Sequence, residues 1–175
     1  VDEIDVYSLS GEKRADFRRE YLGFVFQSFH LINYLTVLEN VMLPLTTIRV
    51  SKNKKVEMAK AALSWVGLSD KIRRMPNQIS GGEKERVAIA RAIVNDPPIL
   101  LADEPTGNLD AKNSREVMKL LRRLNDCGMT VFMVTHSPAC AESAKRKLKV
   151  SDGEIVWDSA SQRSEAGSRL STVRV

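Results

Sequence analysis

Residues 79–110 combine two features that constrain the fold of this chain more than any other segment. Ser80–Glu83 has the S-x-x-E pattern of a capping box, in which the serine hydroxyl and the glutamate carboxylate each accept from the other residue's backbone amide. The pattern predicts a helix N-terminus, whose unpaired amides attract anions. The apolar run Ile99–Ala102 follows and leads into Asp103-Glu104, and two adjacent carboxylates at the end of a buried strand favour a metal ion and water. The segment therefore predicts an anion site and a metal-and-water site.

The hydrophobic pattern alternates between strand-like and helix-like segments. The predicted apolar strands are Tyr21–Gln27, Ile99–Ala102 and Thr130–Thr135. The predicted helices cover residues 12–20, 36–45, 56–66, 80–95 and 114–125. Strands that are apolar on both faces and separated by helices indicate an α/β fold, with a parallel sheet covered by helices on both sides.

The two ends of the chain give weaker patterns. The first ten residues alternate weakly between polar and apolar and predict a strand that ends in a turn. Residues 148–157 predict a terminal β-hairpin around Asp152-Gly153. Residues 159–175 are dominated by Ser, Arg, Glu and Gly, and we expect this tail to be disordered.

Composition restricts the class of protein. With 175 residues, 43% of them hydrophobic and 28% charged, the chain is expected to form one globular domain. No apolar stretch approaches the roughly 18 residues that span a membrane, and the acidic N-terminus has no signal-peptide pattern. Cys127 and Cys140 fit no metal-binding spacing and indicate a reducing compartment. The net charge of +5 is spread over short basic clusters, which favours solvated helix faces over a nucleic-acid surface.

Four separated motifs resemble those of an ATP-binding cassette (ABC) ATPase. Ile79–Ile93 resembles the signature motif, Ile99–Asp110 the Walker B segment with its D-loop, Gln27 the Q-loop and His136 the H-loop. A narrower likeness, to the ATPases of lipoprotein-release and macrolide-export systems, is carried by Gly23–Gln27, Leu35–Val41 and Asp103–Asp110. The resemblance implies a P-loop NTPase-like parallel sheet core with an inserted helical subdomain at about residues 28–79, within a partial ABC ATPase domain of residues 1–158.

The phosphate loop of such ATPases is the motif that this sequence does not contain. None of the nine glycines begins a G-x-x-x-x-G-K-[ST] pattern. In the family this loop and its strands lie upstream of the position where the sequence begins. We therefore interpret the chain as a family member without its N-terminal segment.

The resemblance also implies a function for individual residues. Asp103 would orient Mg²⁺, and Glu104 would polarise the attacking water as general base. Gln27 would contribute to the metal and γ-phosphate site, and His136 would hydrogen-bond the γ-phosphate. The D-loop residues Asn108, Leu109 and Asp110 would lie across a dimer interface.

The signature residues would act on a second subunit. In this family Ser80, Gly81, Gly82 and Glu83 bind the ATP that the other subunit holds, so their amides should face solvent or a partner. Many family members carry Gln at the position of Glu83, and we expect Glu83 to point back to its own helix cap. The implied cofactors are ATP and Mg²⁺.

The implied function is ATP binding and hydrolysis by the subunit that powers export or release of a substrate. Its partners would be a transmembrane permease and a second ATPase subunit in a head-to-tail homodimer, and no nucleic-acid partner is expected. The chain would be cytoplasmic and peripheral on the inner (plasma) membrane. Two alternatives remain open: a degenerate subunit that never turns over ATP itself, and a nucleic-acid-linked ABC-type ATPase.

Overall fold

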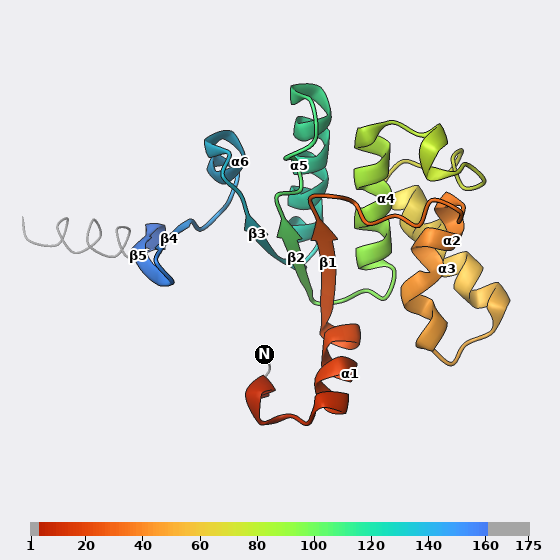
Figure 1. Ribbon diagram of the computed structural model, residues 1–175, viewed down its shortest axis with the longest axis horizontal. Helices are drawn as coiled ribbons and strands as arrows, with labels where there is room; N and C mark the ends of the chain where they lie inside the picture. The colour runs from red at the N-terminus through yellow and green to blue at the C-terminus, as the bar shows by residue number, and fades with distance from the viewer. Residues whose placement is uncertain (1–3, 161–175) are drawn as a thin grey trace, which may run out of the picture. The chain divides into compact units, whose positions relative to one another are not determined.

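The computed structural model of the protein describes residues 4–160, and these form two compact units. The first unit ends at Thr135 and the second begins at His136. The first contains the sheet and the helices around it, and the described part of the second contains a short helix, a hairpin and a helical end at Ser159 and Ala160 (Figure 1). Within the described residues, no helix is both long and apolar enough to cross a membrane.

A three-stranded parallel sheet forms the centre of the first unit. Its strands lie in the order β1 (Leu22–Phe26), β2 (Ile99–Asp103) and β3 (Thr130–Val134). The register pairs Phe26 with Asp103 and Asp103 with Val134, so all three strands end at the same edge. The prediction of a parallel sheet is confirmed, and the carboxyl edge of such a sheet is where α/β proteins bind ligands.

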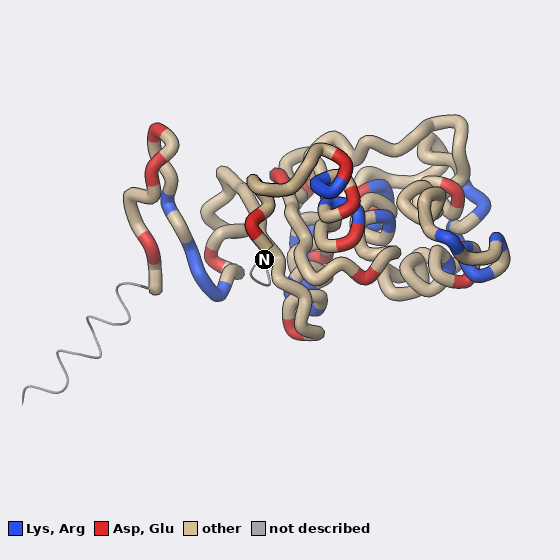
Figure 2. The backbone as a smooth tube through the Cα atoms, turned by 90° about the horizontal axis from the view of Figure 1, so that it is seen from below, with Lys and Arg blue, Asp and Glu red and all other residues tan. Residues whose placement is uncertain are grey.

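Helices pack against this sheet and against one another (Figure 1). The helices of the first unit are α1 (Gly11–Tyr21), α2 (Val37–Met42), α3 (Lys52–Trp65), α4 (Gly81–Ile93) and α5 (Ala111–Asp126). α4 contacts β1, α5 contacts β3, and α2 and α3 pack on α4. Short 3₁₀ helices are found at Val6–Ser8, Leu43–Thr47 and Pro76–Gln78. Basic and acidic residues are interspersed along these elements (Figure 2).

The two faces of the sheet differ in burial, which corrects the expectation that helices cover both. Val25 and Leu100 lie on the face that joins the hydrophobic core and are almost fully buried. On the opposite face, Phe132 is 54% exposed and Val134 is 51% exposed. Because these side chains are apolar, the sequence predicted helices on both faces of the sheet. Near β3, however, the helices of residues 4–135 cover only one face.

Close contact between α4 and β1 depends on Gly23. A Cβ at this position would lie 2.4 Å from the carbonyl oxygen of Ala92, a backbone atom that cannot move aside cheaply. The glycine therefore allows the end of α4 to approach the strand that leads to Gln27.

A buried asparagine organises the loop before α2. Asn40 is fully buried, and its side-chain amide donates to the carbonyl oxygens of Ile32, Leu35 and Thr36. Its Oδ1 accepts from the amide of Ile32 at 2.8 Å. Both the amide nitrogen and the amide oxygen of this side chain have partners, as burial of a polar group requires.

The N-terminal prediction was wrong. Residues 4–10 form no strand; Asp5 caps a 3₁₀ turn at Val6–Ser8, and Ser10 caps α1 by accepting from the amide of Lys13. Both caps are short polar side chains that accept from nearby backbone amides. Such local hydrogen bonds compete with extended structure. The predicted helix at residues 12–20 is confirmed as α1.

The second unit consists of α6 (Pro138–Glu142) and the hairpin of β4 (Leu148–Ser151) and β5 (Glu154–Asp158). The hairpin confirms the prediction from Asp152-Gly153, and both turn residues have positive φ. Arg146 pairs with Asp158 at 2.6 Å across its open end. Of the tail expected to be disordered, residues 161–175 lie outside the described residues.

Candidate functional site

The carboxyl edge of the sheet brings three predicted site residues together. Phe26 and Asp103 are Cα partners at the ends of β1 and β2. Gln27 is the residue after Phe26, and Glu104 is the residue after Asp103. Parallel strands that end together place Gln27, Asp103 and Glu104 at neighbouring positions of one edge. Asp103 is exposed, and its carboxylate has no hydrogen bond or ion pair to any residue from 4 to 160.

Glu104 has an unusual backbone conformation. Its φ of 45° lies in the left-handed region, which a non-glycine residue adopts only when its surroundings enforce it. Here the Glu104 amide donates to the carbonyl oxygen of Val134 at 2.9 Å, and its carbonyl accepts from the Gly107 amide at 3.0 Å. The Thr135 hydroxyl donates to its carboxylate at 3.2 Å. The two adjacent strands thus fix the direction of this carboxylate.

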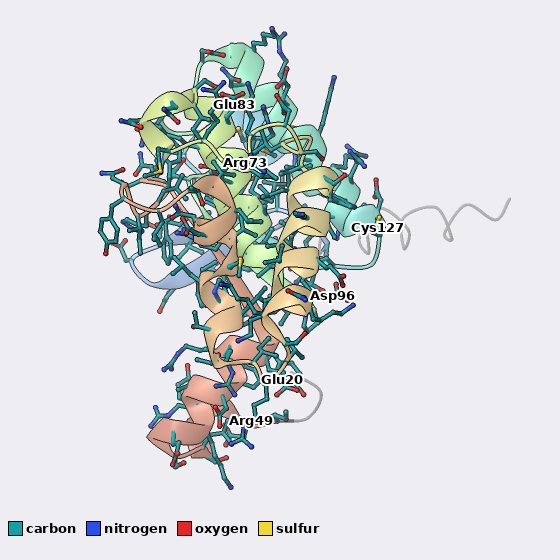
Figure 3. The ribbon with its side chains drawn as sticks, turned by 90° about the vertical axis from the view of Figure 1, so that its right-hand side faces the viewer. Glu20, Arg49, Arg73, Glu83, Asp96 and Cys127 are labelled. Atoms are coloured by element: carbon teal, nitrogen blue, oxygen red, sulfur yellow. The ribbon has the colours of Figure 1, made fainter. Side chains whose placement is uncertain are left out.

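The capping box predicted at the start of α4 is confirmed. The Ser80 hydroxyl accepts from the Glu83 amide at 3.3 Å, and the Glu83 carboxylate accepts from the Ser80 amide at 2.8 Å. The second of these bonds is the main reason that the pKa of Glu83 lies below its ordinary value. Lys71 adds an ion pair to Glu83 at 3.7 Å. Figure 3 shows Glu83 near the start of α4 and Asp96, which follows the helix, well separated from it.

The two glycines of the signature have different surroundings. Gly81 is exposed, as expected, and a Cβ there would meet only Leu109 Cδ2 at 3.7 Å. Gly82 is buried, which corrects the expectation that its backbone faces solvent or a partner. A Cβ on Gly82 would lie 2.2 Å from Asn113 Oδ1, so glycine is required here for packing within the subunit. The Ser80 amide is taken by the Glu83 carboxylate, so an open amide of this helix N-terminus lies at the exposed Gly81.

We predict opposite effects for alanine at these two positions. Gly82→Ala should lower the free energy of unfolding by about 1–2 kcal/mol, because Asn113 must move out of its place and overpacking costs more than the gain in helix propensity. Gly81→Ala should leave stability unchanged or raise it by up to about 1 kcal/mol. Urea unfolding measures both. Combining Gly82→Ala with Asn113→Ala removes the two nearest atoms and leaves the Asn113 Cβ at 2.9 Å, so it should recover part of the loss. No recovery at all would show that the Asn113 side-chain amide is not its cause.

The D-loop connects the sheet edge to the signature. Asn108 Nδ2 donates to the carbonyl oxygen of Gln27 at 2.8 Å, and Leu109 lies beside Gly81, with Cδ2 3.7 Å from where a Cβ of that glycine would be. Asp110 caps α5 by accepting from the amides of Lys112 and Asn113 at 2.9 and 2.8 Å. The hydrogen bonds from Asn113 are the main reason that the pKa of Asp110 is lowered. Asp110 thus has a clear structural function, and its place at a dimer interface stays a prediction.

The side-chain oxygens at the carboxyl edge of the sheet are suitable ligands for a magnesium ion. Asp103 and Glu104 provide carboxylates and Gln27 an amide oxygen, and Mg²⁺ prefers a few such oxygens together with water. Within residues 4–160 no three His, Cys, Asp or Glu side chains gather to form a metal site, so at most two carboxylates are on offer. The exposed Gly81 amide at this helix N-terminus likewise fits one anionic group of a nucleotide.

His136 is the first residue of the second unit, and its function in γ-phosphate binding stays a prediction. Sequence reasoning missed two residues that shape the site. Asn113 packs on Gly82, and Arg91 donates to the carbonyl oxygens of Phe29 and His30. The one available signal for Asn113 was its place in the first turn after the Asp110 cap.

Comparison with known proteins agrees with this geometry. The family model described as ABC transporter matches residues 2–107. The chain is 50% identical over 149 residues to the uncharacterized ABC transporter ATP-binding protein MJ1508 of Methanocaldococcus jannaschii, covering 85% of this chain and 66% of that protein. It is 43% identical over 165 residues to the macrolide export ATP-binding/permease protein MacB of Chromobacterium violaceum, covering 94% of this chain and 26% of MacB.

A solved structure extends the agreement to the fold. The ATP-binding cassette MJ0796, solved as a dimer in a post-hydrolysis state bound to ADP and Pi, superposes with a TM-score of 0.79 at 41% identity, covering 90% of this chain and 70% of that one. The resemblance to export-type cassettes and the fold class are thereby confirmed. This chain belongs to the ABC transporter family, as an ATP-binding cassette of the MacB and MJ0796 type.

Proposed function

We propose that the full-length gene product containing this sequence is the ATP-hydrolysing subunit of an ABC transporter that drives export or release of a substrate through a membrane permease. The observation that carries the proposal is the Glu104 carboxylate, held by an enforced left-handed backbone and by Thr135 beside the exposed Asp103. Strained backbone at the carboxyl edge of a parallel sheet is a feature of catalytic positions. MacB carries an ATP-binding part and a permease part by name, which supports a permease partner here.

In this proposal each residue of the edge has one task. Glu104 accepts a proton from the water that attacks the γ-phosphate, and Thr135 keeps its carboxylate in place for that transfer. Asp103 and Gln27 hold Mg²⁺, in part through water. When bound, the ion neutralises charge on the phosphate oxygens. The family likeness, and not its place at the edge, is the reason for assigning γ-phosphate binding to His136.

The signature would complete the ATP site of a second subunit. Ser80 and Gly81 are exposed at the positive end of the α4 dipole, and the Gly81 amide can bind the γ-phosphate of the partner's ATP. Glu83 keeps its carboxylate turned to the cap, and Gly82 brings Asn113 against the helix start. Asn108, Leu109 and Asp110 adjoin this surface and would contact the partner subunit. MJ0796 was solved as a dimer, which supports a second subunit here, and we propose that the two subunits pair head to tail.

The proposal assigns the remaining segments by the same family likeness. Residues 1–158 would belong to one ABC ATPase domain, and about 28–79 would form the helical subdomain that contacts the permease. The protein would lie on the cytoplasmic face of the inner membrane. α2 and α3, which pack on the signature helix α4, are suited to pass its movement to such a partner.

Magnesium dependence tests the assignment of Asp103. We expect steady-state hydrolysis of ATP by the full-length product to stop when EDTA removes Mg²⁺. Asp103→Asn should raise the Mg²⁺ concentration for half-maximal rate at least tenfold, since loss of a charged ligand costs more than about 1.4 kcal/mol. Phosphate release measured across a magnesium titration gives both results. A wild-type protein that binds ATP and shows no hydrolysis would instead support the degenerate-subunit alternative.

A further inference from the structure

The segment after Gln27 has a conformation that its own sequence disfavours. Phe29 and His30 have φ values of 59° and 47°, so two successive non-glycine residues lie in the left-handed region. The turn that they form is closed by bonds from the Phe29 amide to the Phe26 carbonyl at 3.0 Å and from the His30 amide to the Ser28 carbonyl at 2.6 Å. Each left-handed residue of this kind costs free energy, so other contacts must hold the segment.

Arg91 provides those contacts. This residue lies in the last turn of α4, and its Nη1 donates to the His30 carbonyl at 2.5 Å while its Nη2 donates to the Phe29 carbonyl at 2.7 Å. The planar fork of a guanidinium matches two carbonyl oxygens side by side, and bonds from a charged donor are stronger than neutral ones. A lysine ammonium has no such fork.

The guanidinium contacts the backbone although a carboxylate lies nearby. Glu85 of the same helix is 1% exposed, and neither of its oxygens has a hydrogen-bond partner among the described residues. Burial lowers the pKa of Arg91, and the ionised form of Glu85 opposes this by favouring the charged guanidinium. The hydrogen bonds of the guanidinium go to the strained segment and not to this acid.

A second anchor fixes the other end of the segment. The Gln27 carbonyl accepts from Asn108, and the Gln27 side chain lies so close to Gly107 that a Cβ there would be 2.8 Å from Gln27 Nε2. Gln27 thus sits between the D-loop on one side and the Arg91-bound turn on the other.

We propose that Arg91 is a positioning residue: by holding the Phe29–His30 turn, it sets the position of the Gln27 side chain at the metal-and-water edge. The inference rests on the proposed ATPase function and extends it. Arg91 itself touches neither substrate nor metal. Its loss should therefore lower the rate of the chemical step more than the affinity for ATP, because Gln27 acts on the metal and the attacking water.

The test uses three variants of the full-length product: Arg91→Met, Arg91→Lys and the matched control Arg86→Met. Arg86 lies on the same helix and pairs with Glu116 at 3.1 Å, so its loss also removes a cation and an ion pair. We expect both Arg91 variants to lower kcat by about 10- to 100-fold with KM changed less than about threefold, as misplacement of a catalytic group does. Arg86→Met should keep kcat within about twofold.

Hydrogen exchange of the peptide covering residues 26–34 is the second readout. Exchange should rise in both Arg91 variants, stay unchanged in Arg86→Met, and stay unchanged in α5 for all three. If Arg91→Met does not fold, Arg91→Lys decides. Wild-type kcat and unaltered exchange in the Arg91 variants would overturn the inference, as would equal losses in Arg86→Met. If the wild type itself does not hydrolyse ATP, the proposed function fails, and the exchange result still decides whether Arg91 holds the turn.

Discussion

Glu104→Gln should reduce ATP turnover by the full-length product by about 10²–10⁴-fold, the usual contribution of a general base. The amide keeps the shape of the side chain, and its oxygen can still accept from the Thr135 hydroxyl, so the local structure should survive. What is lost is the ability to take a proton from water. Since nucleotide binding does not need this step, the ATP-bound dimer should accumulate.

Steady-state phosphate release and size-exclusion chromatography with Mg-ATP measure the two effects. Glu116→Gln is the matched control, because Glu116 is a half-exposed carboxylate on α5 that forms an ion pair with Arg86. That variant should hydrolyse ATP at nearly the wild-type rate. Near-normal hydrolysis by Glu104→Gln would remove Glu104 from the catalytic role and favour a different base.

Glu85→Gln should change the pH dependence of stability. Burial raises the pKa of Glu85 from 4.5 to about 8, and the charge of Arg91 only partly opposes this. Between these values the folded protein binds more protons than the unfolded chain, so the free energy of unfolding falls as pH rises through this window. Above pH 8, this pKa shift lowers the free energy of unfolding by at most about 5 kcal/mol. An amide at this position does not ionise and avoids this loss.

Urea unfolding at pH 5 and pH 8.5 checks this prediction. The variant and the wild type should have similar stability at pH 5, and the variant should be more stable by several kcal/mol at pH 8.5. Glu83→Gln is the control of opposite sign, since the pKa of Glu83 is lowered and its stabilisation is lost as pH falls. Parallel pH profiles for wild type and Glu85→Gln would show that Glu85 is charged in the folded protein at neutral pH.

Local interactions explain which parts of the structure the sequence predicted. The capping box of α4 joins residues three apart, and the hairpin turn at Asp152-Gly153 is set by its own residues, so both were found. The paired carboxylates were placed correctly because strand length and register bring Phe26 opposite Asp103. Family resemblance, rather than pattern, supplied the functions of Gln27 and His136.

The missed features arise from contacts between distant parts of the chain. Gly82 is buried because Asn113, which is distant in the sequence, packs on it. No local sequence pattern predicts that contact. The Arg91 contact joins residues 61 and 62 positions apart. The left-handed backbone of Glu104 depends on Val134 and Gly107. Helix α6 was missed for another reason: it is five residues long, too short for a hydrophobic period, although Ser137 and Pro138 form a recognisable start.

Activity recovered from two inactive variants would test the central claim, that the signature of one subunit completes the ATP site of the other. Gly81→Asp should fold, because a Cβ at Gly81 meets only Leu109, yet its carboxylate should repel a phosphate. Mixed in equal amounts with Glu104→Gln and allowed to exchange, it forms dimers that contain one site with both Glu104 and an intact signature. The account predicts ATPase activity of up to about a quarter of the wild-type rate, from half of the dimers with one working site each. A mixture as inactive as each variant alone, although both variants dimerise with Mg-ATP, would contradict it.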